Sequence, residues 1–341
     1  MMVKPKAVPG QETEALVPMR FTAMQALAYQ ATLGRGDWEL NERLDVVYCK
    51  PREAESTTLG CGYLYAFATH KPGITCLFLI DNEAKMVPII QPIFEVFYDN
   101  MPEWPDIGFS TKPYIGRLGS RSRQEGWNSE SIEFVHPVVG GGKVSSFIMF
   151  ASSKAVQTAR SARFFMVVRS ERGFYGDAMG QGTEEALDNA LRASVLATGI
   201  DYSESTSNGP RGSFYNKFQA IRSGEVLGTA LLLYWFQDTG KRVLPNTAAW
   251  RKYMVAPWTL EETELAKRFP DDGLDPGWRI CWRRQAIAEI ASEKTSGDPA
   301  AAKAQFLRDF PEDEVTVWAS PVIAQYDQGI LAQMAKEIPV V

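Results

Sequence analysis

Histidine is scarce in this sequence, and cysteine is not spaced for metal or redox chemistry. The only two histidines, His70 and His136, argue against a His-based metal site or a Ser-His-Asp triad, because both need imidazoles at defined positions. The four cysteines have no CxxC spacing and stand mostly inside apolar runs, which is typical of buried thiols in a reducing compartment. Both residue types are therefore expected to be structural.

Long apolar runs and an excess of basic charge are also missing. No stretch approaches the roughly 18 uncharged apolar residues of a membrane span, and the N-terminus has no apolar signal-peptide segment. The net charge of −5 does not indicate a nucleic-acid or membrane partner, so a polyanion would need a local basic patch. The 341 residues, 45% of them hydrophobic, are enough for one large α/β domain or two moderate ones.

The chain does contain short apolar runs that alternate with helical patterns. This alternation, with short turns, predicts an α/β fold with a mainly parallel sheet flanked by helices. Strands are expected at 44–49, 74–80, 164–168, 199–204 and 227–236, and helices at 21–33, 58–69, 84–100 and 183–197. Pro88 and Pro92 must kink or shorten one of these helices. Residues 131–135 and 144–152 are expected to form a hairpin around the glycines at 140–142.

The last hundred residues have a different, helical pattern. Helices are expected at 259–269, 276–293 and 300–310, and the first has capping-box spacing between Thr259 and Glu262. The predicted organisation is a flexible arm over 1–18, an α/β core over 19–238 and a helical subdomain or linker over 239–341.

Residues 50–57 (KPREAEST) lie between an apolar strand and an apolar helix. A tight polar loop in this place is typical of a phosphate loop, where backbone N–H groups and the helix N-terminus bind an anion and a Ser/Thr hydroxyl binds Mg²⁺. The consensus Gly-Lys is replaced here by Ala54-Glu55. The alternative is a polar connection with an ordinary helix cap at Ser56 or Thr57. The sequence Gly-Gly-Gly-Lys at 140–143 also suggests a phosphate loop, but β-rich sequence follows it, so a hairpin is favoured.

Polar residues follow three of the predicted strands, at 50–57, 169–171 and 205–209. In an open parallel sheet the ligand crevice lies beyond these strand ends. Phosphoryl transfer needs a phosphate cradle, a metal-holding acid, a residue that orients water and a sensor of the γ-phosphate. Glu171 is placed as the hydrolytic base, and the Ser205 and Thr206 hydroxyls as the sensor.

Five motifs follow one another over about residues 18–320. They are Lys50-x-Arg52-Glu53 with Ser56-Thr57, Arg160-Ser161 with Ser170-Glu171, Ser205-Thr206-x-x-Gly209 with Gly212-x-Phe214-Tyr215, Trp282-Arg283-Arg284, and Phe306 to Pro311. Their order resembles the large terminase subunit of tailed bacteriophages, the ATP-driven motor that packages DNA. That family commonly has K-x-R-Q-x-G-x-S-T, Asp-Glu at the acidic strand, and S-T-P-x-G followed by G-x-F-Y. This chain departs from those motifs at Ala54, Glu55 and Ser170.

The resemblance implies a P-loop-type ATPase domain with ATP and Mg²⁺ as cofactors. The implied nucleotide-binding residues are Gln25, Lys50, Arg52, Glu53, Ala54, Glu55, Ser56, Thr57, Ser205 and Thr206. The implied metal site consists of Ser56, Thr57, Ser170 and Glu171. Catalysis falls to Glu171, Arg52 and Arg160, with Arg160 or Arg163 as a finger toward a neighbouring subunit's nucleotide.

The resemblance also implies partners: double-stranded DNA, a portal protein, the small terminase subunit and further copies of the chain in a ring on the procapsid. The protein would work in the host cytoplasm, docked transiently on the portal and away from membranes. The family's nuclease domain is expected to be absent from this chain. Basic residues that could contact DNA, or simply be solvated surface, are Arg117, Arg121, Arg123, Arg283 and Arg284.

Two alternatives stay open. The departures at Ala54, Glu55 and Ser170 are also what a non-hydrolysing, terminase-like DNA- or capsid-binding ring component would have. An unrelated α/β enzyme could use the same strand-end residues to bind another anion.

Overall fold

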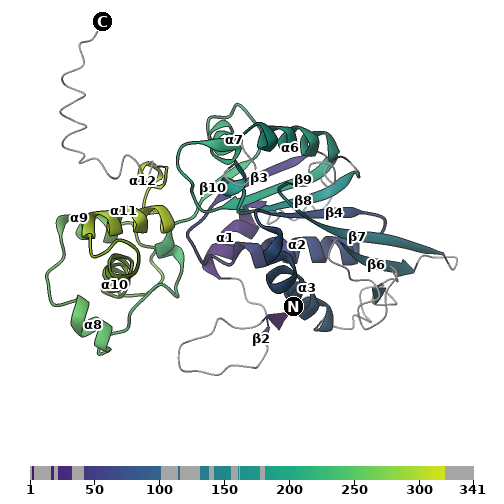
Figure 1. The fold of residues 1–341 in the computed structure, drawn as a ribbon. Coiled ribbons are helices and arrows are strands. Elements are labelled where there is room, and N and C mark those ends of the chain that lie inside the picture. The colour runs from purple at the N-terminus through teal and green to yellow at the C-terminus, as the bar shows by residue number, and fades with distance from the viewer. Residues whose placement is uncertain are drawn as a thin grey trace, which may run out of the picture.

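A computed structural model describes most of the chain. The described residues are 2–3, 17–18, 22–32, 42–100, 114–115, 131–137, 142–154, 160, 162–176 and 181–318. They form an α/β body followed by a helical part, residues 235–318 (Figure 1). Most of the predicted arm, 1–18, lies outside the described residues, within which β1 (Met2–Val3) pairs antiparallel with β2 (Val17–Pro18).

The body is built on one sheet with the order β10-β3-β9-β8-β4-β7-β6-β5. Neighbours from β10 to β7 are parallel, while β7–β6 and β6–β5 are antiparallel. The strands are β3 (Leu44–Cys49), β4 (Thr75–Ile80), β5 (Tyr114–Ile115), β6 (Ser131–Pro137), β7 (Lys143–Ser152), β8 (Phe164–Ser170), β9 (Val195–Ser205) and β10 (Thr229–Leu232). The antiparallel β6–β7 pair is the predicted hairpin.

Helices cover both faces of the sheet (Figure 1). One face packs on α1 (Ala23–Thr32), α2 (Ser56–His70) and α3 (Gln91–Asp99), and the other packs on α6 (Gln181–Ser194) and α7 (Gly212–Arg222). Gly60 lets α2 approach the sheet, since a Cβ there would stand 2.9 Å from Val168 Cγ1. A strand, a polar loop and a helix inside a parallel sheet is the arrangement of P-loop NTPases. The predicted fold class is confirmed.

Several predicted boundaries shift for identifiable reasons. The helix expected at 84–100 becomes a 3₁₀ turn (Glu83–Lys85), a π-helical stretch (Met86–Ile90) that contains Pro88, and α3, which carries Pro92 in its first turn. Proline lacks the N–H that a regular helix interior requires. The helix expected to reach residue 197 ends at Ser194, because Val195 already pairs with Phe164 in the sheet. The strand expected at 227–236 is shorter, Thr229–Leu232.

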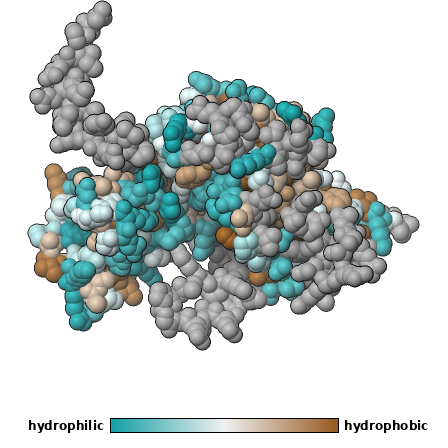
Figure 2. All heavy atoms as spheres, in the orientation of Figure 1, coloured by the Kyte–Doolittle hydropathy of each residue, from teal (hydrophilic) through white to brown (hydrophobic). Residues whose placement is uncertain are grey.

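The helical part has its own apolar core around Trp235, Ile280 and Phe306. It contains the 3₁₀ turn Trp235–Gln237, α8 (Ala248–Tyr253), α9 (Leu260–Ala266), α10 (Pro276–Lys294), α11 (Pro299–Asp309) and α12 (Glu314–Val317). The predicted capping box is present: Glu262 N–H donates to Thr259 Oγ1 at 3.2 Å, and Thr259 N–H donates to Glu262 Oε2 at 2.8 Å. Polar side chains cover much of this part, with apolar spheres at its outer end (Figure 2).

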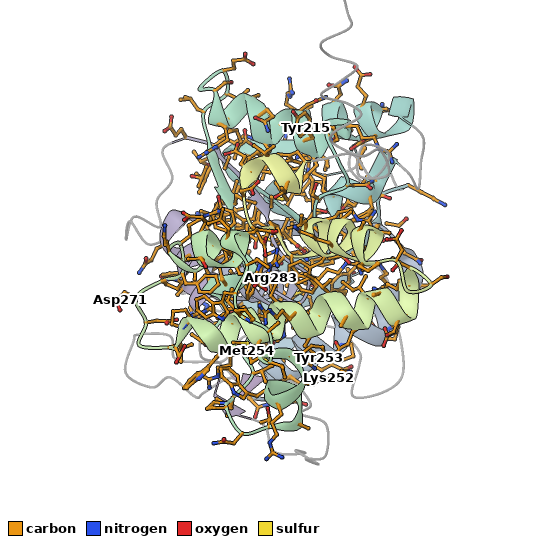
Figure 3. The ribbon with its side chains drawn as sticks, turned by 90° about the vertical axis from the view of Figure 1, so that its left-hand side faces the viewer. Tyr215, Lys252, Tyr253, Met254, Asp271 and Arg283 are labelled. Carbon is orange, nitrogen blue, oxygen red and sulfur yellow. The ribbon has the colours of Figure 1, made fainter. Side chains whose placement is uncertain are left out.

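Arg283 and Arg284 are structural residues here, which corrects their candidacy as DNA contacts. Arg283 lies in the middle of the helical part (Figure 3), 4% exposed, with its Nε 2.6 Å from Glu312 Oε1. Arg284 pairs with Glu262 and donates to three backbone carbonyls, those of Tyr253, Ala256 and Pro257. Guanidinium groups with such sets of partners hold helices together and have few N–H groups left for a phosphate. Arg117, Arg121 and Arg123 lie outside the described residues.

Candidate functional site

The three polar segments that follow strands, 50–57 (the first station), 169–171 (the second) and 205–209 (the third), meet at one edge of the sheet. Strands β3, β9 and β8 are neighbours, and Cys49 is in register with Ser205 while Ser170 is in register with Glu204. Lys50 N–H donates to Ser205 C=O at 3.0 Å, which ties the first station to the third. The C-terminal ends of parallel strands at the point where helices cross to both faces form the usual ligand crevice of such a sheet.

The backbone at this edge is strained. Five non-glycine residues of the described chain have positive φ, and three of them are here: Glu53 at 63°, Glu55 at 54° and Glu171 at 56°. Each such conformation costs on the order of 1–3 kcal/mol and clusters at functional sites. Left-handed residues between ordinary ones turn successive N–H groups into a shared concavity that binds anions. The 50–57 segment therefore combines this backbone with the N-terminus of α2, which begins at Ser56.

Lys50 is the central cation of the site. Its side chain is buried, and its Nζ lies 2.8 Å from Glu171 Oε1 and 3.1 Å from Glu204 Oε2. Burial by itself lowers the pKa of Lys50, but the two carboxylates outweigh it and raise this pKa above its ordinary value. Burial likewise raises the pKa of Glu171, and the Lys50 ammonium overcomes that effect, so the pKa of Glu171 is lowered. Both groups are charged at neutral pH.

Glu204 is the residue that the sequence reasoning missed. Its side chain is fully buried, and four groups donate to it: Lys50, Ser56 Oγ at 2.8 Å to Oε2, Thr57 Oγ1 at 3.0 Å to Oε1, and Ser170 Oγ at 2.6 Å to Oε1. A signal was available in the period of two along β9. Glu204 shares a face with Ile200 and Tyr202, which pack in the core with α2.

Glu171 and Ser205 form the outer side of the site. Ser205 Oγ donates to Glu171 Oε2 at 3.4 Å and accepts from Gly173 N–H at 3.1 Å. The side chain of Glu171 is 26% exposed, in contrast to that of Glu204. A water molecule can reach Glu171, as a hydrolytic base requires. Thr206 is 4% exposed and follows directly at the same strand end.

The donor set fits a hard divalent cation. Ser56, Thr57 and Ser170 contribute hydroxyl oxygens, and Glu171 and Glu204 contribute carboxylate oxygens within the same cluster. Oxygen ligands, with only one or two carboxylates, are what Mg²⁺ takes beside a phosphate group. No cluster of three or more His, Cys, Asp or Glu side chains suited to a metal occurs in the described residues. The site is thus suited to a cation that arrives with an anionic ligand.

The other candidates of the 50–57 segment turn away from the cluster. Arg52 Nε lies 3.0 Å from Asp309 Oδ1 in α11, and Glu53 pairs with Lys241. Ala54 is 3% exposed and packs with Met24 and Leu233. Gln25 Nε2 donates to Glu55 C=O at 3.0 Å, so α1 braces the segment.

Arg160 and Arg163 lie at the opposite edge of the sheet. They line a hollow with Asn189 and Ser194, beside the beginning of β8 and the end of α6. Glu171 follows the other end of β8, at the full length of a seven-residue strand, roughly 20 Å away. Within one chain, Arg160 therefore does not join Lys50 and Glu171.

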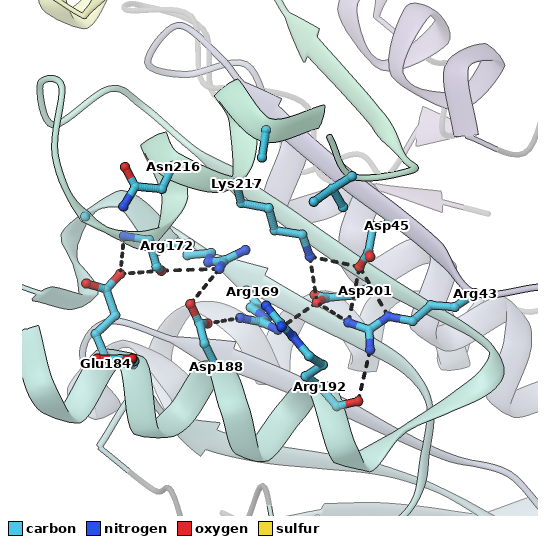
Figure 4. Close-up of a pocket in the computed structure, with 15 residues that line it drawn as sticks. Arg43, Asp45, Arg169, Arg172, Glu184, Asp188, Arg192, Asp201, Asn216 and Lys217 are labelled. Atoms are coloured by element: carbon cyan, nitrogen blue, oxygen red, sulfur yellow. Dashed lines mark hydrogen bonds and ion pairs between the residues drawn. The ribbon is translucent and has the colours of Figure 1, made fainter. Parts of the chain in front are cut away.

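Behind the site, between the sheet and helices α6 and α7, is a charged cavity of about 700 Å³ (Figure 4). Arg172 Nη1 donates to Ser203 Oγ at 3.0 Å and Nη2 lies 2.9 Å from Asp188 Oδ2. Arg169 Nη2 lies 2.7 Å from Asp201 Oδ2. In the sequence, Glu171 is thus flanked by Arg169 and Arg172. Both arginines are 2% exposed, and their side chains are held in this cavity on the side of the sheet that faces α6 and α7.

The pKa values in this cavity follow from burial and from charge crowding. Burial raises the pKa of Asp201, but Arg169, Lys217 and the other cations around it overcome this, so its pKa lies well below the ordinary range. Asp188 behaves in the same way beside Arg172 and Arg169, with a lowered pKa. Burial lowers the pKa of Lys217. The Asp201 carboxylate raises this pKa, but Arg172 and Arg169 offset part of that increase, so the pKa stays lowered. The network is a set of mutually dependent charges.

No protein-family model and no curated protein matches this chain. Among solved structures, it is similar to the Thermus phage P74-26 large terminase ATPase domain, with a TM-score of 0.38 and 14% identity, over 69% of this chain and 87% of that one. It is also similar to a point mutant of that ATPase domain, with a TM-score of 0.42, 13% identity and coverage of 87% and 94%.

A further similar structure is the large terminase of another thermophilic bacteriophage, in complex with ADP. The TM-score is 0.45 and the identity 10%, over 70% of this chain and 51% of that one. The match therefore spans about half of the length of that terminase. In the described part of the present chain, no helix has both the length and the apolar character needed to cross a bilayer.

Proposed function

We propose that this chain is the ATPase part of a viral DNA-packaging motor of the large-terminase type. The observation that carries the proposal is the convergence of Lys50, Glu171 and Ser205 with the Ser56 and Thr57 hydroxyls at the ends of β3, β8 and β9. These are the groups that phosphoryl transfer requires, in the order that resembles the terminase motifs. The strained backbone at Glu53 and Glu55 supports a phosphate cradle in the 50–57 segment.

The residues of the site divide the steps of this mechanism among them. Lys50 and the backbone N–H groups of the 50–57 segment bind the phosphates. Glu171, the more exposed carboxylate, orients a water molecule and accepts its proton, while Ser205 holds Glu171 by its hydrogen bond. Mg²⁺ would be held by Ser56, Thr57 and carboxylate oxygens of the cluster, and it neutralises charge on the phosphates when bound. The hydroxyl groups of Ser205 and Thr206 act as the sensor of the γ-phosphate.

The remaining parts of the proposal concern assembly. Arg160 or Arg163, on the far edge of the sheet, would reach the nucleotide of a neighbouring copy in a ring, which agrees with their distance from the site within one chain. Double-stranded DNA, a portal protein and the small terminase subunit would be the partners, in the host cytoplasm and at the procapsid. The contact of Arg52 with Asp309 of α11 would transmit a movement of the 50–57 segment, caused by hydrolysis, to the helical part.

Calorimetric titration with ATPγS and Mg²⁺, followed by a phosphate-release assay with ATP, tests the function. Binding and release are expected from the wild type. A second candidate, a non-hydrolysing DNA- or capsid-binding ring component, is favoured by the neutralisation of Lys50 by two carboxylates. Absence of heat at millimolar nucleotide would support that candidate and refute the first.

A further inference from the structure

The side-chain charges at the candidate site oppose the binding of a phosphate ligand. Lys50 is the one cation in contact with Glu204 and Glu171 at this cluster within the described residues, and it faces both at once. The three side chains together carry a net charge of about −1, because two carboxylates surround one ammonium. A polyphosphate that approaches this group alone meets repulsion, which in a partly buried site is substantial.

Glu204 and Glu171 differ in what surrounds them. Glu171 is partly exposed and has the position of a base, whereas Glu204 is fully buried against the N-terminus of α2. Glu204 alone receives both the Ser56 and the Thr57 hydroxyl. These are the hydroxyls at the place where a phosphate loop holds its cation.

The end of β8 places the Ser170 hydroxyl beside the Glu204 carboxylate. Ser170 Oγ is 2.6 Å from Glu204 Oε1 and 3.2 Å from Thr57 Oγ1, so the Glu204 carboxylate reaches the space in front of Ser170 from the neighbouring strand. The carboxylate of β9 thus lies within hydrogen-bond distance of the last side chain of β8.

We propose that Glu204 makes nucleotide binding at this site conditional on a divalent cation: its carboxylate holds the cation together with the Ser56 and Thr57 hydroxyls, and so frees Lys50 for the phosphates. The inference rests on the proposed function. Glu204, Ser205 and Thr206 are consecutive, so one strand end carries both the cation-holding acid and the phosphate-sensing hydroxyls. Cation occupancy and phosphate sensing are then coupled through a single stretch of β9.

The test compares ADP binding in Mg²⁺ with ADP binding in EDTA by calorimetry, for the wild type and for Glu204→Gln. The wild type should bind about 10-fold or more tightly with Mg²⁺. In Glu204→Gln the ratio should fall below about 3-fold, because metal-free affinity rises as a repulsive charge is lost and Mg²⁺ affinity falls. Electron paramagnetic resonance of Mn²⁺, titrated in the presence of ADP, should report weaker metal binding in the same variant.

Two further variants separate this role from a structural one. Glu312→Gln removes another buried, cation-paired glutamate, outside the site, and should keep the wild-type ratio and Mn²⁺ affinity. The double variant Glu204→Gln with Ser170→Asp returns a carboxylate to the same space from β8 and should restore the Mg²⁺ dependence. In Glu204→Gln and in the double variant, Glu171 still pairs with Lys50, so the buried ammonium keeps a carboxylate partner.

The outcomes are distinguishable. A wild-type ratio in Glu204→Gln, or no recovery in the double variant, overturns the assignment of Glu204 while nucleotide binding by the wild type leaves the proposed function standing. A wild type that binds no nucleotide in either condition overturns the proposed function, and this inference with it.

Discussion

Arg52 and Asp309 are joined twice, by side chains and by backbone. The Arg52 Nε lies 3.0 Å from Asp309 Oδ1, and the Arg52 N–H donates to the Asp309 carbonyl at 2.8 Å. Arg52 belongs to the 50–57 segment and Asp309 ends α11, so the candidate phosphate loop is fastened to the helical part. A ligand that shifts this segment must therefore either move α11 as well or break the two contacts between Arg52 and Asp309.

Asp309→Asn is expected to loosen the segment with little global effect. Arg52 is half exposed, so its ion pair contributes less than about 1 kcal/mol to the free energy of unfolding. Amide hydrogen exchange over residues 50–57 should nevertheless become faster, while urea denaturation changes little. Glu314→Gln, which breaks the exposed Arg222–Glu314 pair, is the matched control and should leave exchange in this segment unchanged. Equal acceleration in both variants would count against the coupling.

Glu171→Gln should abolish ATP turnover and retain nucleotide binding. Loss of a general base lowers kcat by about 10²–10⁴-fold. Phosphate release and calorimetry with ATPγS measure the two properties separately. Glu185→Gln, on the exposed side of α6, should behave as the wild type. Full activity in the Glu171 variant would remove it from the role of base.

Gly173→Ala should impair turnover through Ser205. An added Cβ would stand 2.8 Å from Ser205 Oγ and 3.1 Å from the Thr206 carbonyl oxygen, so Ser205 must move away from Glu171. We expect kcat to fall by about 10-fold or more, as misplacement by a fraction of an ångström disorients a catalytic group. Nucleotide affinity should change little. Gly273→Ala, where a Cβ meets nothing within 4 Å, should lower stability by about 1 kcal/mol and spare turnover.

Asp201 should dominate the acid sensitivity of the fold. Its folded-state pKa is depressed, so the stabilisation it contributes is present above its unfolded pKa of about 3.9 and is lost as pH falls through the folded value. Asp188 adds in the same direction. Urea denaturation should give a nearly constant free energy of unfolding from about pH 7 to 5 and a decline below about pH 4.

Asp201→Asn should remove much of that decline and destabilise the protein at neutral pH by about 3–5 kcal/mol, because Arg169, Lys217 and Arg43 lose the buried carboxylate that they share. A variant as stable as the wild type at pH 7 would contradict the role given to this pair.

The sequence predicted those parts of the site that depend on local order. The apolar run before Lys50 and the polar run after it fix where β3 ends and α2 begins, and the same holds for Glu171 after β8. Helix α7 was not predicted, although Phe214, Phe218 and Ile221 recur at helical spacing, because the turn-forming residues Asn208-Gly209-Pro210 and Gly212 obscure where it begins.

The charged cavity could not be predicted from the sequence in this way. Along β9, Asp201 and Ser203 alternate with Ile200 and Tyr202, which is the pattern of a strand with one face in water. The structure buries this face completely, because Arg169 and Lys217, distant in sequence, neutralise Asp201. Charge pairing between remote segments leaves no periodic trace in a single sequence.

Trp235 gives the chain an optical reporter of its own. Its fully buried indole donates to Glu312 Oε1 at 3.2 Å and lies 4.9 Å from the Trp282 ring, over which the Lys241 ammonium stands at 5.1 Å. Lys241 in turn pairs with Glu53 of the 50–57 segment. Indole emission responds to nearby charge, so displacement of Glu53 by a ligand should alter the intrinsic fluorescence without any attached dye.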